Sequence, residues 1–310
     1  MILTVTPNPA LDVTYDVDRL VPHTSHRVRQ VRERAGGKGV NVASVLALMG
    51  EPVLATGVVG GPSGDVLRAD LDRRRIRHDL LPGDLTTRRT VTVVSAQDGD
   101  ATAFNEPGAS WPGELRDALV VHVERLLRVH RPAVLVVSGS VPPGFGGEGC
   151  AALVAAGHAA GARVVLDTSR DALVDALPSG PDVIKPNRDE LYAVTGTAEP
   201  VEGAKALQRK GARHVLVSLG ADGMVLVEPD GTVLRAGLRE PLRGNPTGAG
   251  DACVAAVATG LARGSAWPDV LGDAVAWSAA AVLRPVAGEV AVEDVSRLRG
   301  LVTLEDTEVR

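Results

Sequence analysis

Short runs of β-branched residues alternate with longer stretches rich in alanine and leucine along most of this chain. The short runs predict strands over residues 2–7, 53–60, 133–140, 162–169, 182–187, 214–220 and 223–231. The longer stretches predict helices over residues 40–49, 114–130, 147–160, 187–195, 202–211, 250–263 and 269–283. Nearly continuous apolar strands separated by helices indicate an α/β fold, in which a mostly parallel central sheet has helices on both faces.

Two regions depart from this rhythm and alternate between apolar and polar residues, as half-exposed antiparallel strands do. They are residues 11–34 and 86–106, and the second contains a candidate hairpin turn at Asp98 and Gly99. We expect these segments to form a small β-lid beside the main sheet. Because no repeat or low-complexity linker is evident, we expect residues 1–310 to form a single domain.

Composition excludes several classes of function. The net charge is −5 and aromatic residues make up 2% of the chain, so neither a basic field nor stacking platforms for nucleic acid are expected. The first residues do not resemble a signal peptide, and no apolar run reaches the roughly 18–20 residues of a membrane span. The two cysteines and seven histidines show no metal-ligand spacing, so we expect a cytoplasmic protein without a His/Cys metal site.

The stretch "GNPTGAGDACVAAVATGLA" places small residues and one aspartate at the start of a predicted helix. Successive amides of Gly248, Ala249 and Gly250 ahead of a helix form an anion-binding concavity. Asp251 is then well placed to take a proton from a hydroxyl that attacks the bound anion. The alternative is structural, because aspartate commonly caps a helix start.

A second glycine-rich stretch, "AGGKGVNVASVLALMG", precedes another predicted helix. Gly36, Gly37 and Gly39 permit close approach of a ligand, Lys38 supplies charge, and Asn41 lies in the first helical turn. The alternative is a flexible turn before an amphipathic helix. The motif is not a Walker A loop, because GxxxxGK[ST] is absent from the sequence.

The stretch "IKPNRDEL" carries Lys185 at a strand end, followed by Asn187 and Glu190. Their spacing is that of a capping box, which is the structural interpretation. In the functional interpretation both residues reach Mg²⁺ through water while Lys185 lies near phosphate, because Mg²⁺ keeps several waters and needs few carboxylates.

A further alternative is a dinucleotide site, since "GEGCAA" fits a relaxed GxGxxA and Asp167 follows about 20 residues later. The intervening "SGSVPPGFG" speaks against it, because that fingerprint directly follows its strand.

Taken together, these motifs resemble the ribokinase-like carbohydrate kinases of the PfkB family. The matching segments span residues 1 to about 285 in the family's order: "TPNPALDVTY", "AGGKGVNVASVLALMG", "SGSVPPG", "KPNRDEL", "VSLGADG" and "NPTGAGDA". The opening, "GGKG" and "NEPG" are most similar to the branch that acts on phosphorylated ketohexoses, the tagatose-6-phosphate kinases and 1-phosphofructokinases. Asn245 and Pro246 stand where the family has Asp-Thr, which puts activation by monovalent cations in doubt and favours the tagatose-6-phosphate kinases.

The resemblance implies a role for each matching residue. Asp251 would be the catalytic base, and the amides of Gly248, Ala249 and Gly250 would form the anion hole. The sugar and its phosphate would be held by Asp12, Arg27, Gly37, Lys38, Asn41, Arg88 and Ser138. ATP and Mg²⁺ would be held by Lys185, Asn187, Glu190, Ser218, Gly220 and Gly223, with Asn187 and Glu190 reaching the metal through water.

The resemblance therefore predicts an ATP-dependent kinase that converts a ketohexose phosphate to a 1,6-bisphosphate. Tagatose 6-phosphate is the first expected substrate, and fructose 1-phosphate and fructose 6-phosphate follow. The family also implies a homodimer formed through the β-lid. Two other classes stay open at this stage: an NAD-dependent dehydrogenase that uses "GEGCAA", and a non-catalytic sugar-phosphate sensor.

Overall fold

The computed structural model describes residues 1–97, 100–168, 170–240 and 242–307 of the chain. The hairpin turn predicted at Asp98 and Gly99 lies outside these residues.

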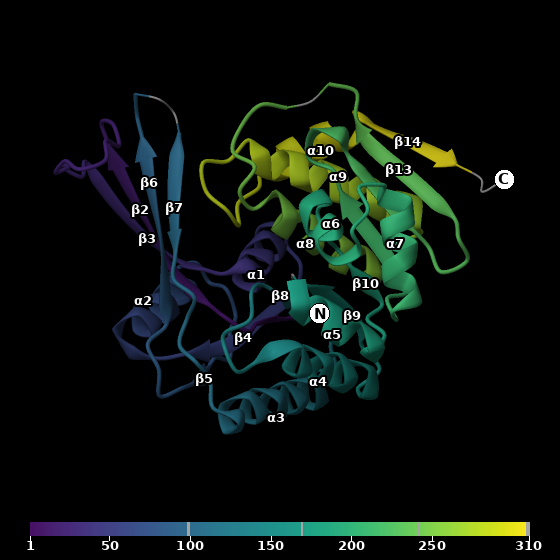
Figure 1. Cartoon of the computed structure of the whole chain (residues 1–310), viewed down its shortest axis with the longest axis horizontal. Coiled ribbons are helices and arrows are strands. Elements are labelled where there is room, and N and C mark those ends of the chain that lie inside the picture. Colours follow the sequence, from purple (N-terminus) through teal and green to yellow (C-terminus); the bar gives the residue numbers. More distant parts are fainter. Residues whose placement is uncertain (98–99, 169, 241, 308–310) are drawn as a thin grey trace.

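The central sheet has its strands in the order β14-β13-β12-β11-β10-β9-β8-β1-β4-β5 (Figure 1). Seven of these strands pair in parallel: β1 (Ile2–Thr6), β4 (Val53–Val59), β5 (Leu81–Pro82), β8 (Val134–Ser138), β9 (Arg163–Asp167), β10 (Val183–Ile184) and β11 (His214–Ser218). The other three pair antiparallel: β12 (Met224–Val227), β13 (Val233–Leu238) and β14 (Val302–Thr307). The mostly parallel sheet is thus confirmed.

The strand predicted at residues 223–231 is β12, which pairs antiparallel with β11. The expectation that it belongs to the parallel strands is therefore corrected. Only Leu219, the 3₁₀ turn η2 (Gly220–Asp222) and Gly223 separate β12 from β11. A parallel connection needs a crossover of a dozen or more residues, so a link this short can only reverse the chain.

Helices cover both faces of the sheet and divide the apolar core in two. One core cluster joins the sheet to α1 (Lys38–Leu48), α2 (Gly61–Arg73), α8 (Ala249–Arg263), α9 (Trp267–Val282) and α10 (Val292–Arg299). The other joins it to α3 (Gly113–His130), α4 (Gly146–Ala159), α5 (Arg170–Ala176), η1 (Leu177–Ser179), α6 (Arg188–Thr195) and α7 (Pro200–Arg209). No helix in the described part of the chain is both long and apolar enough to cross a membrane.

Most helices match the predicted ranges, but α2, α5 and α10 were missed. The sequence of α2 begins "GPSG", which as a local pattern is typical of a turn. Proline is nevertheless well tolerated in the first turn of a helix, where its missing N–H costs nothing. Leu67 and Leu71 of α2 are fully buried in the first core cluster, and this packing decides its helical state.

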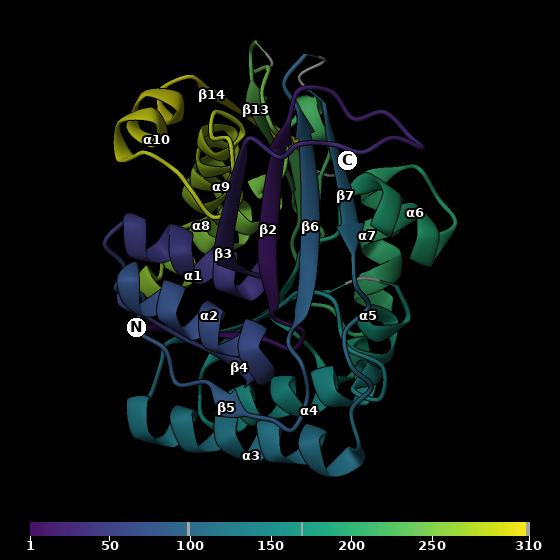
Figure 2. The same ribbon diagram turned by 90° about the vertical axis from the view of Figure 1, so that its left-hand side faces the viewer.

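A second sheet of four strands stands apart from the main body, in the order β3-β2-β6-β7 (Figures 1 and 2). Its strands are β2 (Ala10–Val17), β3 (Gln30–Gly36), β6 (Arg88–Ser95) and β7 (Ala101–Asn105). They come from the two regions predicted to form the lid. The central pair, β2 and β6, is parallel rather than antiparallel, since these strands are not joined by a hairpin but by an intervening unit of the main fold.

The carboxyl ends of β8, β9, β10 and β11 lie along one edge of the main sheet, as the parallel pairing requires. They carry Ser138, Asp167, Lys185 just after Ile184, and Ser218. Polar side chains that are distant in sequence are therefore brought to one place.

Candidate active site

Asp251 lies in the first turn of α8, whose N-cap is Gly248 in the left-handed region (φ 87°). Its carboxylate does not cap the helix: Oδ2 accepts a hydrogen bond of 2.9 Å from Nδ2 of Asn41, 210 residues away in sequence. The capping interpretation is therefore wrong. Burial, reinforced by the negative charge of Asp167, raises the pKa of Asp251 to about 7, although Lys38 and Asn41 act in the opposite direction.

Asp167, at the end of β9, is the centre of a charge network beside Asp251. Oδ1 lies 3.5 Å from Lys185 Nζ, Oδ2 lies 3.6 Å from Lys38 Nζ, and Oδ2 also accepts a hydrogen bond of 3.0 Å from Ser138 Oγ. Burial alone would raise the pKa of Asp167, but the two lysines outweigh it and the pKa is lowered. The carboxylate is thus held ionised within the protein.

The two lysines respond to the same network. The pKa of Lys38 is raised chiefly by Asp167, and burial opposes the shift. Burial alone would lower the pKa of Lys185, but Asp167 outweighs it and the pKa is raised. Both side chains are therefore cationic, and a Cβ at Gly250 would lie 3.4 Å from Lys185 Nζ. Positive charge and the start of α8 consequently meet at one point.

Asp167 is a functional candidate that sequence reasoning placed only in the dinucleotide alternative. The available signal was a polar residue at the end of an apolar strand, next to other such ends. Which partners it finds depends on α1 and β10, which come from distant parts of the chain.

Asn187 and Glu190 form the capping box of α6, so the structural interpretation of their spacing is correct. Asn187 Oδ1 accepts from the backbone N–H of Glu190 at 2.8 Å, and Glu190 Oε2 accepts from that of Asn187 at 2.9 Å. The other carboxylate oxygen, Oε1, lies 3.7 Å from Lys38 Nζ. The cap therefore orients Glu190 and leaves one of its oxygens toward the charge network.

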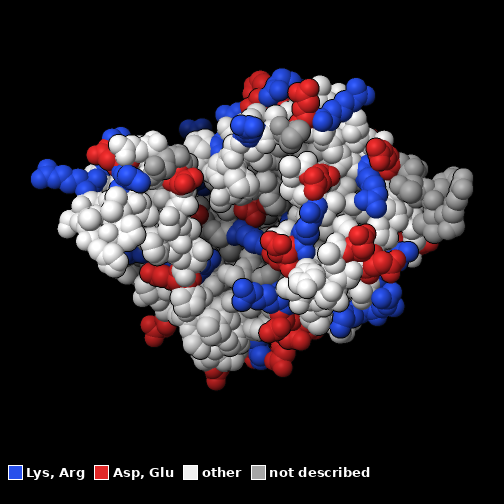
Figure 3. Space-filling view, turned by 45° about the horizontal axis from the view of Figure 1, so that its top comes forward, with Lys and Arg blue, Asp and Glu red and all other residues white. Residues whose placement is uncertain are grey.

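A cavity of about 730 Å³ opens between the small sheet and the main body, and Figure 3 shows this face hollowed and lined by charged side chains. Its lining includes Lys38, Arg88 and Ser140. Arg88 is held in place by bonds from Nε to the carbonyl of Asn8 (3.2 Å) and from Nη1 to that of Glu106 (3.1 Å). Asp251 is not part of this lining, and Lys38 is the residue that joins the cavity to the Asp251 network.

Asp12, on β2, lies directly over Gly36, where a Cβ would come within 2.0 Å of its Oδ2. Burial raises the pKa of Asp12 to about 6, and Arg88 acts against this shift. Gly37 has a φ of 96°, and its Cβ would lie 3.0 Å from Thr6. Only glycine fits both positions, so the chain approaches the site closely here.

Not every predicted residue faces this site. Ser138 is fully buried and donates to Asp167, whereas Ser140 lines the cavity. Arg27 is exposed in the segment between β2 and β3. Gly220 begins the η2 turn, Ser218 and Gly223 lie on either side of it, and Ser218 forms an isolated β-bridge with Asn187.

Another cavity, of about 750 Å³, lies beside α2 and β4. It is lined by Leu54, Arg68, Asp72, Arg75, Ile76, Arg77, His78, Asp79, Leu80 and His130. It shares no residue with the site described above, so size alone does not identify the functional cavity.

The comparisons with known proteins identify the fold and the chemistry. The family model of the pfkB family carbohydrate kinases matches residues 6–294. The chain belongs to this family. It is an ATP-dependent sugar-phosphate kinase with the ribokinase-like α/β fold. The dehydrogenase and sensor alternatives are thereby overturned.

Among the relatives of this PfkB kinase is a 1-phosphofructokinase from Xanthomonas campestris, 40% identical over 272 residues, which are 84% of this chain and 83% of the relative. Two structures of phosphofructokinase-2 from Escherichia coli each cover 96% of this chain and 98% of theirs. The complex with potassium has a TM-score of 0.89 and 27% identity. The complex with fructose 6-phosphate has a TM-score of 0.86 and 28% identity.

Proposed function

We propose that this kinase phosphorylates a ketohexose monophosphate to a 1,6-bisphosphate, and that its substrate is fructose 1-phosphate. The observation that carries the reaction is the buried carboxylate of Asp251, with a pKa of about 7, at the start of α8 beside two lysines. The 1-phosphofructokinase relative at 40% identity supports the substrate. Tagatose 6-phosphate, which the sequence favoured, is the second candidate because of Asn245 and Pro246.

In this proposal Asp251 is the general base. A pKa near the working pH suits a base, because the group is largely ionised yet retains a driving force for proton transfer. Asp251 removes the proton of the attacking sugar hydroxyl while the amides of Gly248, Ala249 and Gly250 face the phosphoryl oxygens. Lys185, close to Gly250, adds positive charge where negative charge is distributed in the transition state.

The donor set fits ATP with Mg²⁺. Lys185 suits phosphate oxygens, and the bare backbone at Gly250 leaves room beside it that a side chain would fill. The described residues contain no group of three or more metal-ligating side chains. A few ligands such as Glu190 and Asn187, acting through water, are sufficient for Mg²⁺, which neutralises phosphate charge. Ser218, Gly220 and Gly223 would border the nucleotide.

We place the sugar between the small sheet and α1, with Asp12, Gly37 and Asn41 holding its hydroxyls. The phosphate already on the sugar requires a second cationic site, which Arg88 and Lys38 supply in the cavity. Ser140 replaces Ser138 in this cradle, because the hydroxyl of Ser138 is buried on Asp167. The role of Arg27 in holding the sugar phosphate stays a prediction, as does a cytoplasmic location.

The proposal is tested by a panel of phosphorylated and free sugars with MgATP, scored by release of ADP. Fructose 1-phosphate is expected to give the highest kcat/KM, followed by tagatose 6-phosphate and fructose 6-phosphate. Free fructose and ribose serve as controls for the second phosphate site. A preference for a free sugar would overturn the substrate class, and a preference for tagatose 6-phosphate would overturn only the first substrate.

Arg88→Ala is expected to raise the KM for the sugar phosphate by about tenfold or more, because a charge-assisted phosphate contact is lost. The KM for ATP should change less than twofold. Arg89→Ala is the matched control, because Arg89 is exposed and its bond to the Glu106 carboxylate comes from its backbone N–H. Equal changes in both KM values would mean that Arg88 does not serve the sugar phosphate.

We also propose a homodimer formed through the small sheet. The strand register places one set of side chains on the face opposite Asp12. This face carries the apolar residues Val13, Tyr15, Val31, Val91, Val93 and Phe104, together with Glu33, Arg89 and Thr102. Val31 and Phe104 are 55% and 56% exposed there. Such a face favours association with a second copy.

Phe104→Asp is therefore expected to convert a dimer to a monomer in size-exclusion chromatography with light scattering. Val121→Asp, on α3 and 63% exposed, is the control and should leave the mass unchanged. A wild-type protein that is monomeric at micromolar concentration would refute this assembly.

A further inference from the structure

The 284–291 segment, between α9 and α10, packs against the starts of α1 and α8, the two helices that carry the candidate catalytic residues. A Cβ at Gly288, whose φ is 71°, would lie 3.1 Å from Oδ1 and 3.2 Å from Cα of Asn41 on α1. A Cβ at Gly248, the N-cap of α8, would lie 2.8 Å from Cα of Ala287. The backbone of residues 287–288 is therefore wedged between the helix that supplies Asn41 and the helix that supplies Asp251.

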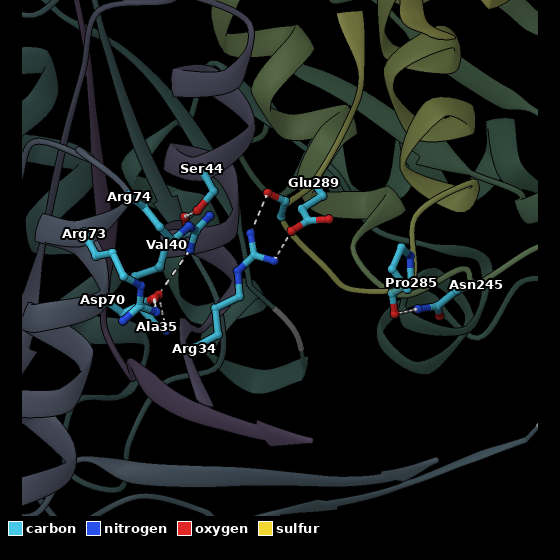
Figure 4. Close-up of polar contacts among 11 residues, drawn as sticks. Arg34, Ala35, Val40, Ser44, Asp70, Arg73, Arg74, Asn245, Pro285 and Glu289 are labelled. Atoms are coloured by element: carbon cyan, nitrogen blue, oxygen red, sulfur yellow. Dashed lines mark hydrogen bonds and ion pairs between the residues drawn. The ribbon is translucent and has the colours of Figure 1, made fainter. Parts of the chain in front are cut away.

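Arg34, on β3 of the small sheet, fixes this segment through two contacts. Nη1 lies 2.6 Å from Glu289 Oε1, and Nη2 donates to the carbonyl of Gly288 at 3.3 Å. The Arg34 side chain is only 20% exposed. Figure 4 shows its guanidinium pointing toward Glu289. A charge-assisted, partly buried pair of this kind is stronger than an ordinary surface ion pair.

The other ends of this arrangement are fixed as well. The buried carboxylate of Asp70 on α2 accepts a bond of 2.8 Å from the backbone N–H of Ala35, next to Arg34, and is itself paired with Arg73 and Arg74. Asn245, ahead of α8, donates from Nδ2 to the carbonyl of Pro285 at 3.0 Å (Figure 4). Strand β3 and the 284–291 segment thus form one connected support.

We propose that Arg34 is a positioning residue that locks the 284–291 segment through Glu289 and Gly288, and that this lock holds Asn41 in hydrogen-bonding position on Asp251. The proposal rests on the proposed function, in which Asp251 is the base. The small sheet then has a second role besides covering the sugar, because the C-terminal end of β3 is linked through these contacts to the catalytic carboxylate.

The physical consequence follows from the bond that Asn41 makes. Its amide donates to Asp251 Oδ2 and thereby stabilises the ionised form of the base. The other charges that act on Asp251 are Asp167, Lys38 and Lys185. Among the described residues, their ion pairs and hydrogen bonds do not involve the 284–291 segment. Releasing Gly288 from Arg34 should therefore weaken the Asn41 bond without moving the lysines.

The test uses the full chain with Arg34→Met, Glu289→Gln and the double variant, measured for kcat, both KM values and the pH profile of kcat/KM. Each single variant should lower kcat at pH 7 by about tenfold. Each should move the acid limb up by about half to one pH unit, the value of one lost hydrogen bond. The KM for ATP should stay within twofold, and the double variant should be no worse than the single ones, because both remove the same lock.

Arg32→Met is the matched control, because Arg32 lies two residues away on β3 and pairs with Asp16 within the small sheet. It should retain the wild-type kcat and pH profile. Arg34→Lys keeps the charge but not the planar two-nitrogen geometry, and should recover part of kcat. If Arg34→Met folds poorly, Glu289→Gln decides alone, since it removes one charge from a residue that is 38% exposed.

An unchanged acid limb in Glu289→Gln, or the same loss of kcat in Arg32→Met, would overturn the proposal. These outcomes differ from a failure of the proposed function itself. If wild-type protein phosphorylates no ketohexose phosphate, or if Asp251→Asn is fully active, the function fails. If wild-type protein is active and the Arg34 and Glu289 variants have the wild-type kcat and pH profile, only this inference fails.

Discussion

Asp251→Asn is expected to lower kcat by about 10²–10⁴-fold while ATP still binds. The side chain keeps its size, and Asn41 can still contact the amide oxygen, but no group remains that accepts the proton of the sugar hydroxyl. ADP release gives kcat, and nucleotide binding by calorimetry shows that the phosphate site is intact. Turnover near the wild-type value would refute Asp251 as the base.

The pH dependence of the wild-type enzyme follows from the same group. Because the base must be ionised, kcat/KM should fall about tenfold per pH unit below the pKa of Asp251, which is about 7. The folded-state pKa is raised above its unfolded value, so ionisation at higher pH costs the folded protein stability. Asp251→Asn should therefore have a melting temperature equal to or above that of wild type at pH 8.

Asp269→Asn is the control for this variant, because Asp269 also lies in the first turn of a helix, α9, but is 69% exposed. It should leave kcat unchanged and the free energy of unfolding within about 0.5 kcal/mol. A clear loss of stability in Asp251→Asn at pH 8 would instead indicate a structural role for Asp251.

Asp167→Asn is expected to lower the free energy of unfolding by about 3–5 kcal/mol, a large part of the stability of a typical domain. The side chain is 1% exposed and Lys185 is 5% exposed, so removal of the carboxylate leaves a buried ammonium group without its anion. Chemical denaturation and thermal unfolding at pH 7 measure this loss. A stability equal to that of wild type would contradict the central role of Asp167 in the network.

The loss should depend on pH in a defined direction. The pKa of Asp167 is lowered in the folded protein, so its contribution is present above the unfolded value of 3.8 and disappears as pH falls through the folded value. The difference between Asp167→Asn and wild type should therefore be constant at pH 5–7 and shrink below about pH 4. Asp269→Asn again serves as the control, because Arg299 keeps Asp273 as a partner.

The acid limb of kcat/KM should also shift in Asp167→Asn, in the direction opposite to that of the Arg34 variants. Asp167 raises the pKa of Asp251, so its neutralisation should move the acid limb of kcat/KM to lower pH. At the same time kcat should fall, because Lys38 and Lys185 lose the anion that holds them beside the start of α8. These opposite shifts separate electrostatic effects on the base from effects on its position.

Local patterns in the sequence were sufficient for most of the main sheet and its helices. Apolar β-branched runs fixed seven strands, because a strand buried on both faces must be apolar along its length. Helix α2 and strands β13 and β14 were missed, since their residues carry turn-forming or polar signals. Their state depends on the sheet and core residues against which they pack.

The candidate site likewise has features that the local sequence predicted and features that it did not. Its motifs, from Gly37 to Asp251, were visible as glycine-rich stretches beside charged residues at element ends. The choice between Ser138 and Ser140 was not. Residues two apart on an extended strand would face the same side, but β8 ends at Ser138 and Gly139 has a φ of 127°, so the chain turns and only Ser140 lines the cavity.

By itself, the sequence determined the alternation of strands and helices, the family and the phosphate chemistry of the glycine-rich stretches, because each is encoded by neighbouring residues. Only the tertiary structure decided that Asn41 binds Asp251, that Asp167 pairs with two lysines, and that Arg34 reaches Glu289. These contacts join residues tens to hundreds of positions apart. Their partners are selected by strand order and helix packing, which no periodicity within a short window contains.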